Sequence, residues 1–187
     1  MDFSVTDDGV LYLYPYYTRG DKEDEMSKEV YHVFKREWNV DRYLPSIYAD
    51  LYAAIESYGA QLGMLGANTA ITVMPSHVRE KYGTNLLKVA EDLAEDFGFT
   101  DESYLIQRTV DKTKSTEGGE RSVSAHLATL GLAHELNSYI DWYIILDDIT
   151  TTGSSLEAAK QLLIRKGVFT RHIIKIAISK TTHDDDY

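Results

Sequence analysis

The residues of this sequence whose types and spacing best suit binding or catalysis lie between positions 142 and 155. An apolar run, Trp-Tyr-Ile-Ile-Leu, leads directly into Asp147 and Asp148. Two adjacent carboxylates can hold Mg²⁺, which prefers hard oxygen ligands, or the hydroxyl groups of a sugar. A hydroxyl-rich turn with one glycine comes next, and it consists of Thr151, Thr152, Gly153, Ser154 and Ser155. This turn can bind a phosphate group, because the backbone N–H groups at a helix N-terminus favour an anion.

Two elements must position these side chains. Residues 142–146 predict a buried strand, and residues 154–166 predict a helix that Gly167 ends. In an open parallel sheet, ligands bind beyond the carboxyl ends of the strands, so the strand delivers both acidic residues to the binding edge. Gly153 lets the backbone approach a phosphate closely, because it has no Cβ. The segment therefore predicts a site for a sugar phosphate, with hydroxyls at the acids and phosphate in the turn.

The same segment resembles the phosphoribosyl pyrophosphate (PRPP) motif of type I phosphoribosyltransferases. That motif is an apolar strand, two acidic residues, two further residues, Thr-Thr-Gly, any residue, and Ser or Thr. Thr150 departs from it, since that position is often apolar. The resemblance implies that Asp147 and Asp148 are catalytic and hold the ribose hydroxyls, directly or through Mg²⁺, and that residues 151–155 bind the 5′-phosphate. Six positions match: Asp147, Asp148, Thr151, Thr152, Gly153 and Ser155.

A second segment resembles the pyrophosphate-binding loop of the same family. The apolar run 69–74 is followed by Pro-Ser-His-Val-Arg and then by Lys-Tyr-Gly-Thr-Asn. This arrangement is similar to the ComF (competence protein F) and amidophosphoribosyltransferase-like subgroup, in which basic residues and a Gly-x-Asn turn follow the strand. Gly83 and Asn85 match that turn. The resemblance implies that Ser76, His77 and Arg79 contact pyrophosphate.

Residues 108–121 form a polar stretch with two consecutive glycines, and we expect a long loop there. The resemblance implies that this loop closes over the pyrophosphate and excludes water from a reactive sugar cation. An ordinary solvated loop is the alternative. The glutamine usual in the family's loop is not evident. The basic residues expected to contact pyrophosphate are Arg108, Lys112, Lys114 and Arg121.

Composition excludes several other classes of function. The 187 residues carry 19 Lys and Arg against 30 Asp and Glu, so the net charge of −11 disfavours direct binding to nucleic acid or anionic lipid. The absence of cysteine excludes disulfides, thiolate catalysis and cysteine zinc sites. The histidines form no compact cluster in the sequence, so a zinc site is not expected. Ser124 and His126 lack the Gly-x-Ser-x-Gly elbow of a hydrolase.

Apolar runs alternate with amphipathic helical patterns, which predicts an α/β fold. We expect a doubly wound, mainly parallel, Rossmann-like sheet of about five strands, as in type I phosphoribosyltransferases. Residues 1–68 are expected to form a strand-helix-helix extension or hood, residues 69–180 the core, and residues 181–187 an acidic flexible tail. The expected strands are 10–14, 69–74, 103–107, 142–146 and 172–179, and the expected helices are 26–38, 44–62, 84–97 and 154–166.

Two hypotheses for function remain open. The first is a phosphoribosyltransferase that binds PRPP with Mg²⁺ and transfers the phosphoribosyl group to an acceptor that the sequence does not identify. The second is a non-catalytic sensor of PRPP or a nucleotide, or an accessory subunit of a DNA-uptake or other multi-protein system. The expected partners are PRPP or a related ribose phosphate, and a second copy of the chain or another protein. The acidic N-terminus and the lack of a long apolar run predict a cytoplasmic protein without membrane contact.

Overall fold

The central feature of the structure is a six-stranded sheet. The computed structural model describes residues 2–17, 24–111 and 122–182. The strand order is β1-β2-β8-β7-β3-β4, and all neighbours are parallel except β1 and β2. The chain is therefore an α/β protein with a mixed, mostly parallel sheet, compatible with a Rossmann-like fold. The strands are β1 (Ser4–Val5), β2 (Val10–Tyr17), β3 (Thr69–Val73), β4 (Thr100–Asp101), β7 (Trp142–Thr150) and β8 (Ile173–Thr182).

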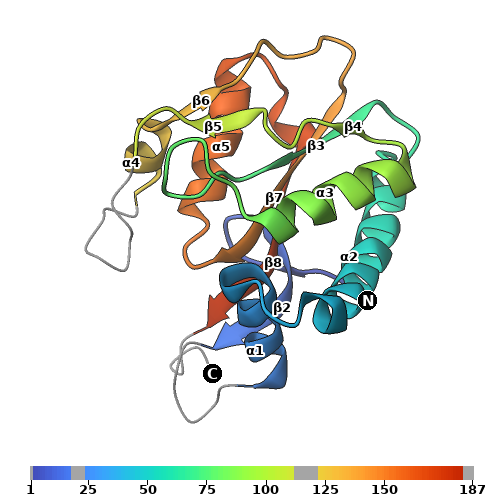
Figure 1. Ribbon diagram of the computed structural model, residues 1–187. Helices are drawn as coiled ribbons and strands as arrows, with labels where there is room; N and C mark the ends of the chain where they lie inside the picture. Colours follow the sequence, from blue (N-terminus) through green and yellow to red (C-terminus); the bar gives the residue numbers. More distant parts are fainter. Residues whose placement is uncertain (1, 18–23, 112–121, 183–187) are drawn as a thin grey trace.

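Helices cover both faces of this sheet. Strand side chains alternate between two apolar clusters, so Ile144 and Leu146 pack on one face while Tyr143 and Ile145 pack on the other. In Figure 1, α2 and α3 lie in front of the sheet and α5 lies behind it. The front layer consists of α1 (Glu25–Tyr31), the π-helix η1 (His32–Arg36), α2 (Val40–Leu62) and α3 (Thr84–Phe97), and the back layer contains α5 (Ser154–Arg165).

A small second sheet of two strands is separate from the main sheet. β5 (Ile106–Arg108) pairs antiparallel with β6 (Leu130–Leu132), and the short helix α4 (Val123–Leu127) precedes β6. The 3₁₀-helix η3 (Thr170–His172) leads into β8. The strand expected over residues 103–107 is wrong in part, because Leu105 N–H donates to the Glu102 carbonyl at 2.9 Å and closes a turn.

Two strands extend further than their apolar runs predict. β7 continues through the acidic residues to Thr150, because its backbone remains paired with β8 as far as Lys180. β2 continues through Pro15, whereas the sequence predicts that this proline ends the strand. On the outer edge of β2, β1 pairs only with Leu11 and Tyr12. Within the described residues no strand therefore lies beside Pro15 on that edge, so the missing N–H of proline costs no hydrogen bond there.

The helix expected over residues 26–38 is divided into two parts. α1 ends at Tyr31, and the chain continues as a π-helical turn to Arg36. The N-cap of α1 is Asp24, whose carboxylate accepts from the Ser27 N–H at 2.6 Å. The helix expected over residues 84–97 is confirmed as α3, and Gly98 ends it in the left-handed conformation.

The N-terminal segment contributes a strand to the main sheet. β2 pairs with β8 from Val10 to Tyr17, and helices α1 and α2 pack on the same apolar cluster as α3. The division proposed at residue 68 stays a prediction. Thr181 and Thr182 belong to β8, and the rest of the expected tail lies outside the described residues. No helix in the described part of the chain has the length and apolar character needed to cross a membrane.

Candidate functional site

The two acidic residues lie at the carboxyl end of β7, as the sequence predicts. Asp147 accepts hydrogen bonds from the Asp148 N–H at 3.0 Å and from the Ser155 hydroxyl at 3.4 Å. Asp148 accepts from the Ile149 N–H at 2.6 Å and from the Lys35 ammonium at 2.7 Å. The first turn of α5 and the front helical layer therefore both contact the acidic pair.

The two carboxyl groups have different environments. Burial, followed by repulsion from Asp148, raises the pKa of Asp147 to about 7, although attraction to Lys35 opposes this rise. One member of the pair is therefore easier to protonate than an ordinary aspartate. A ligand that brings a positive charge or hydroxyl donors to the pair would stabilise the ionised form of Asp147.

Lys35 provides a positive charge at the acidic pair. Its side chain is 44% exposed, whereas that of Asp148 is 14% exposed. Desolvation lowers the pKa of Lys35, but attraction to Asp148 and Asp147 outweighs it, so the pKa is raised. Lys35 remains charged, and its ammonium group occupies one oxygen of Asp148.

The expected phosphate-binding turn packs tightly against the N-terminal hairpin. Gly153 has φ +72°, and a Cβ there would lie 2.3 Å from a carboxylate oxygen of Asp8 and 3.1 Å from Val10. The Gly153 N–H donates to the buried Thr150 hydroxyl at 3.1 Å. The hydroxyl at position 150, where the family motif is often apolar, therefore fixes the turn by binding one of its backbone donors.

The hydroxyl groups of the turn also contact one another. The hydroxyls of Thr152 and Ser154 lie 2.9 Å apart, and those of Thr151 and Thr181 lie 3.4 Å apart. The contact with Thr181 links the turn to the end of β8, which runs beside β7. The turn is thus held from both sides, by the hairpin and by the neighbouring strand.

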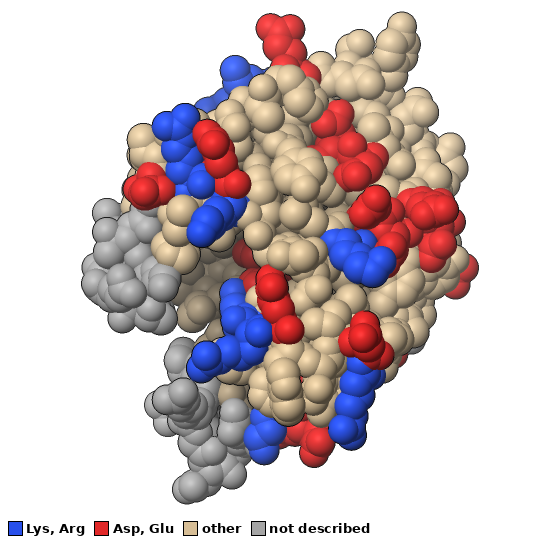
Figure 2. Space-filling view, in the orientation of Figure 1, with Lys and Arg blue, Asp and Glu red and all other residues tan. Residues whose placement is uncertain are grey.

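One cavity of about 530 Å³ brings together residues from both predicted loops. Figure 2 shows a hollow on the left of this face, with Lys and Arg atoms above and below it. Thr151, Thr152, Gly153 and Ser154 do not line this cavity. The predicted site residues that do line it are Asp147, Asp148, Ser155, Ser76, His77 and Arg108.

The loop after β3 folds back on itself beside the acidic pair. The Ser76 N–H donates to the Lys81 carbonyl at 2.8 Å, which closes the loop. Ser76 and His77 line the cavity, but Arg79 does not. The Arg79 side chain is 62% exposed and pairs with Glu80 at 3.1 Å, so the structure does not bring it to the acidic pair. Lys81, from the same loop, lines the cavity instead.

Arg108 is a buried strand residue, although the sequence predicts that the flexible loop begins there. It lies in β5 with 3% of its surface exposed. Its guanidinium donates to the Ser76 carbonyl at 3.1 Å and to the Thr129 hydroxyl. Burial lowers its pKa, although attraction to Asp147 opposes this shift. Arg108 therefore anchors the loop after β3. The other predicted basic residues, Lys112, Lys114 and Arg121, lie outside the described residues.

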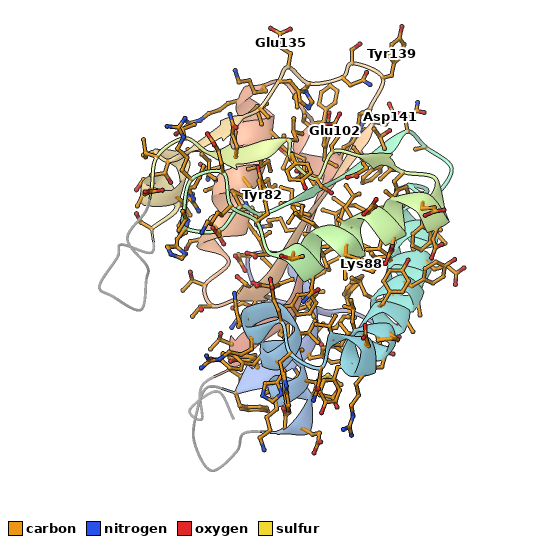
Figure 3. The ribbon with its side chains drawn as sticks, viewed as in Figure 1. Tyr82, Lys88, Glu102, Glu135, Tyr139 and Asp141 are labelled. Atoms are coloured by element: carbon orange, nitrogen blue, oxygen red, sulfur yellow. The ribbon has the colours of Figure 1, made fainter. Side chains whose placement is uncertain are left out.

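Several residues at the cavity were not predicted as site residues. Tyr82 lies between the loop and β5 (Figure 3), and its hydroxyl donates to the Ile106 carbonyl at 2.9 Å. Lys81 follows the predicted pyrophosphate contacts by two residues, so the basic character of the loop was a usable signal. Lys35 lies 113 positions before Asp148 and had no such signal. The lining residues with polar or ionisable side chains that the sequence analysis missed are Lys35, Lys81, Tyr82 and His126.

The acidic pair has the donor chemistry that Mg²⁺ requires. Carboxylate oxygens are hard ligands, and Mg²⁺ completes its shell with water and with oxygens of a bound ligand. Within the described residues, no group of three or more His, Asp or Glu side chains is arranged to hold a metal. Asp147 and Asp148 would thus be the protein ligands of a cation shared with the bound molecule.

Two further cavities lie at the opposite end of the sheet. They measure about 500 and 390 Å³ and share Leu136 and Lys166. Glu135, Tyr139 and Asp141 mark this end in Figure 3. Neither cavity is lined by a residue of the predicted site, so the acidic pair and its cavity are the candidate functional site.

Comparison with known proteins adds no assignment to this geometry. No protein-family model matches the chain. No curated protein matches it significantly either.

Proposed function

We propose that this protein binds PRPP together with Mg²⁺ and transfers the phosphoribosyl group to an acceptor. The observation that carries the proposal is the shared cavity, in which the acidic pair, Ser155 and the loop after β3 meet. The carboxylates suit ribose hydroxyls or a metal ion, and the basic residues beside them suit phosphate oxygens. This combination supports a ligand that carries both a diol and phosphate groups.

Each part of the site would contact a different part of PRPP. Asp147 and Asp148 would bind the ribose hydroxyls, and the turn at residues 151–155 would bind the 5′-phosphate. His77 and Lys81 would contact the pyrophosphate. Mg²⁺, when bound, would neutralise charge on the phosphates.

The chain's own residues would contribute to the transfer through electrostatics. The bond between the anomeric carbon and pyrophosphate breaks, and a bond to the acceptor forms. The carboxylates would stabilise positive charge that develops on the sugar. Lys81, from the loop after β3, would stabilise the negative charge of the departing pyrophosphate. Arg108 would act indirectly, because its guanidinium holds the Ser76 carbonyl at 3.1 Å.

Titration calorimetry with PRPP, with and without Mg²⁺, tests this proposal. The same mixtures should be assayed for released pyrophosphate in the presence of nucleobases and amines. We expect Mg²⁺-dependent binding, and loss of a charged contact in Asp148→Asn should weaken it by at least about tenfold. Asp141→Asn is the matched control, because Asp141 lies at the opposite end of the sheet (Figure 3).

The outcomes separate the two hypotheses for function. Binding accompanied by pyrophosphate release with some acceptor would support the enzyme. Binding without release from any acceptor class would favour the sensor or accessory protein. An absence of PRPP binding, or equal binding by Asp148→Asn and Asp141→Asn, would overturn the proposal.

A further inference from the structure

The contact between Lys35 and Asp148 joins the front helical layer to the acidic pair. The ammonium nitrogen lies 2.7 Å from the Asp148 carboxylate, and the two residues are 113 positions apart in the sequence. Lys35 and both acidic residues line the same cavity. The contact is therefore part of the candidate site, and no motif in the sequence indicated it.

The backbone that presents Lys35 is held in an unusual conformation. Lys35 belongs to the π-helical turn η1, and its neighbours Val33 and Phe34 are buried in the core. The Val33 carbonyl accepts a buried hydrogen bond from the Asn85 side chain at 2.7 Å. Single π-helical turns occur frequently at functional sites. The backbone at Lys35 is thus fixed to α3, while its side chain remains 44% exposed.

The exposure of the lysine side chain makes this ion pair exchangeable. Exposed pairs are weak because water and salt screen them, and a flexible lysine side chain gains freedom when it is released. Asp148 has two oxygens, and the second already accepts from the Ile149 N–H at 2.6 Å. A cation or a hydroxyl group that binds Asp148 strongly would compete with Lys35 for the remaining oxygen.

We propose that Lys35 is a binding-site residue that occupies Asp148 in the ligand-free protein and leaves it when a divalent cation binds the acidic pair. The inference rests on the role proposed above for this pair in ligand binding. Lys35 would make the empty site less attractive to cations by neutralising one carboxylate. Its displacement would couple the front helical layer to occupancy of the site.

Direct binding of Mn²⁺, followed by electron paramagnetic resonance, tests the competition without PRPP. Lys35→Met removes the competing charge, so we expect it to bind Mn²⁺ at least about fivefold more tightly than the wild type. Lys35→Arg keeps the charge and should bind like the wild type. Lys88→Met is the matched control, because Lys88 pairs with Asp92 on the exposed side of α3 (Figure 3). Equal affinity of Lys35→Met, Lys88→Met and wild type would overturn the inference.

A second measurement uses the unaltered chain, so it does not depend on the folding of a variant. Amine acetylation, quantified by mass spectrometry, reports how exposed each lysine is. Saturating Mn²⁺ should increase the acetylation rate of Lys35 severalfold and leave that of Lys88 unchanged. An unchanged rate at Lys35 under conditions in which Mn²⁺ saturates the site would refute the displacement.

The two proposals fail in distinguishable ways. If Lys35→Met strengthens Mn²⁺ binding but PRPP does not bind, the competition at Asp148 stands and the proposed function falls. If PRPP binds with Mg²⁺ but the Lys35 substitution has no effect on Mn²⁺ affinity, the function stands and the role of Lys35 falls.

Discussion

Among the described aspartates and glutamates, Asp147 has a pKa that is raised toward neutrality. Its pKa is raised to about 7 by burial and by Asp148, from an ordinary value of 3.8. Between these two values the folded chain holds a proton that the unfolded chain has released. Stability contributed by Asp147 is therefore complete below about pH 4 and is lost as the pH rises through about 7.

The direction of this pH dependence of stability can be tested with Asp147→Asn. Urea unfolding across pH 4.5 to 7.5 should show a stability that falls with rising pH more steeply in the wild type, by at most about 1.4 kcal/mol per pH unit. Glu157 has a pKa shifted in the opposite direction, where burial is outweighed by its bond to Lys175. Its contribution is present in both proteins and cancels in the difference. Parallel curves for wild type and variant would show that Asp147 does not titrate in this range.

Gly153 illustrates a residue for which both conformation and space require glycine. Its φ of +72° is nearly that of Gly63, at +71°, but a Cβ added at Gly63 would meet no atom within 4 Å, whereas one at Gly153 would. Gly63→Ala should cost about 1–2 kcal/mol from the left-handed conformation alone. Gly153→Ala should cost about 1 kcal/mol more, because Asp8 can turn away but the buried Val10 cannot. Urea unfolding of both variants measures the difference, and equal losses would contradict the packing against Val10.

At the scale of elements, Asn85 links the N-terminus of α3 to the π-helical turn. Its side-chain amide donates to the buried Val33 carbonyl at 2.7 Å. Asn85→Ala leaves that carbonyl without its donor, which should lower the free energy of unfolding by about 1–3 kcal/mol. Asn68→Ala is the control, because the Asn68 amide makes only an exposed contact with Asp141 at 3.4 Å and should change stability by less than about 0.5 kcal/mol.

The same substitution should also disturb the site. Since Val33 and Lys35 belong to one turn, a shift of that turn would weaken the contact with Asp148. We expect Lys35 in Asn85→Ala to be acetylated faster than in Asn68→Ala. A loss of stability with unchanged Lys35 reactivity would mean that Asn85 supports the core without positioning Lys35.

Long periodic elements were predictable from the sequence, and short ones were not. The apolar spacing in residues 84–97 gives α3 its full extent, and the run 69–74 gives β3 to within one residue. Strands of two or three residues, such as β1 and β6, carry no measurable period, so nothing in the sequence marks them. The π-helical turn has the same residue types as an ordinary helix, and only packing distinguishes it.

The candidate site was predictable where its residues lie close together in the sequence. Asp147, Asp148 and Ser155 come from one strand-turn-helix segment, and the structure brings all three to one cavity. Arg79 was expected there because of its place in the loop, but its side chain pairs with Glu80 instead. Contacts such as that of Lys35 depend on how the front layer packs, which local sequence does not encode.

At the scale of the whole molecule, the charge of the cavity differs from that of the chain. The chain carries a net charge of −11, yet Lys35, Lys81 and Arg108 line the same cavity as the two acidic residues. Figure 2 shows basic side chains above and below the hollow, with acidic side chains beside them and over the right part of this face. An anionic ligand is thus repelled by most of the surface and attracted at the site, which favours selective binding there.

A buried lysine joins three parts of the fold behind the turn at residues 151–155. The Lys175 ammonium, on β8, donates to the Glu157 carboxylate of α5 and to the Asp8 carbonyl of the N-terminal hairpin, each at 2.7 Å. Its side chain is 1% exposed, so its charge depends on these partners. Asp8 also packs against Gly153, so the same residue that ties the hairpin to the sheet sets the back of the turn.

Replacing this lysine should destabilise the fold far more than replacing an exposed one. Lys175→Met removes the positive charge that pairs with the Glu157 carboxylate. We expect the free energy of unfolding to fall by about 2–4 kcal/mol. Lys88→Met should cost less than about 0.5 kcal/mol. The double variant Lys175→Met/Glu157→Gln should recover part of the loss, because no unpaired carboxylate remains. A double variant no more stable than Lys175→Met would show that the unpaired Glu157 carboxylate is not the source of the loss.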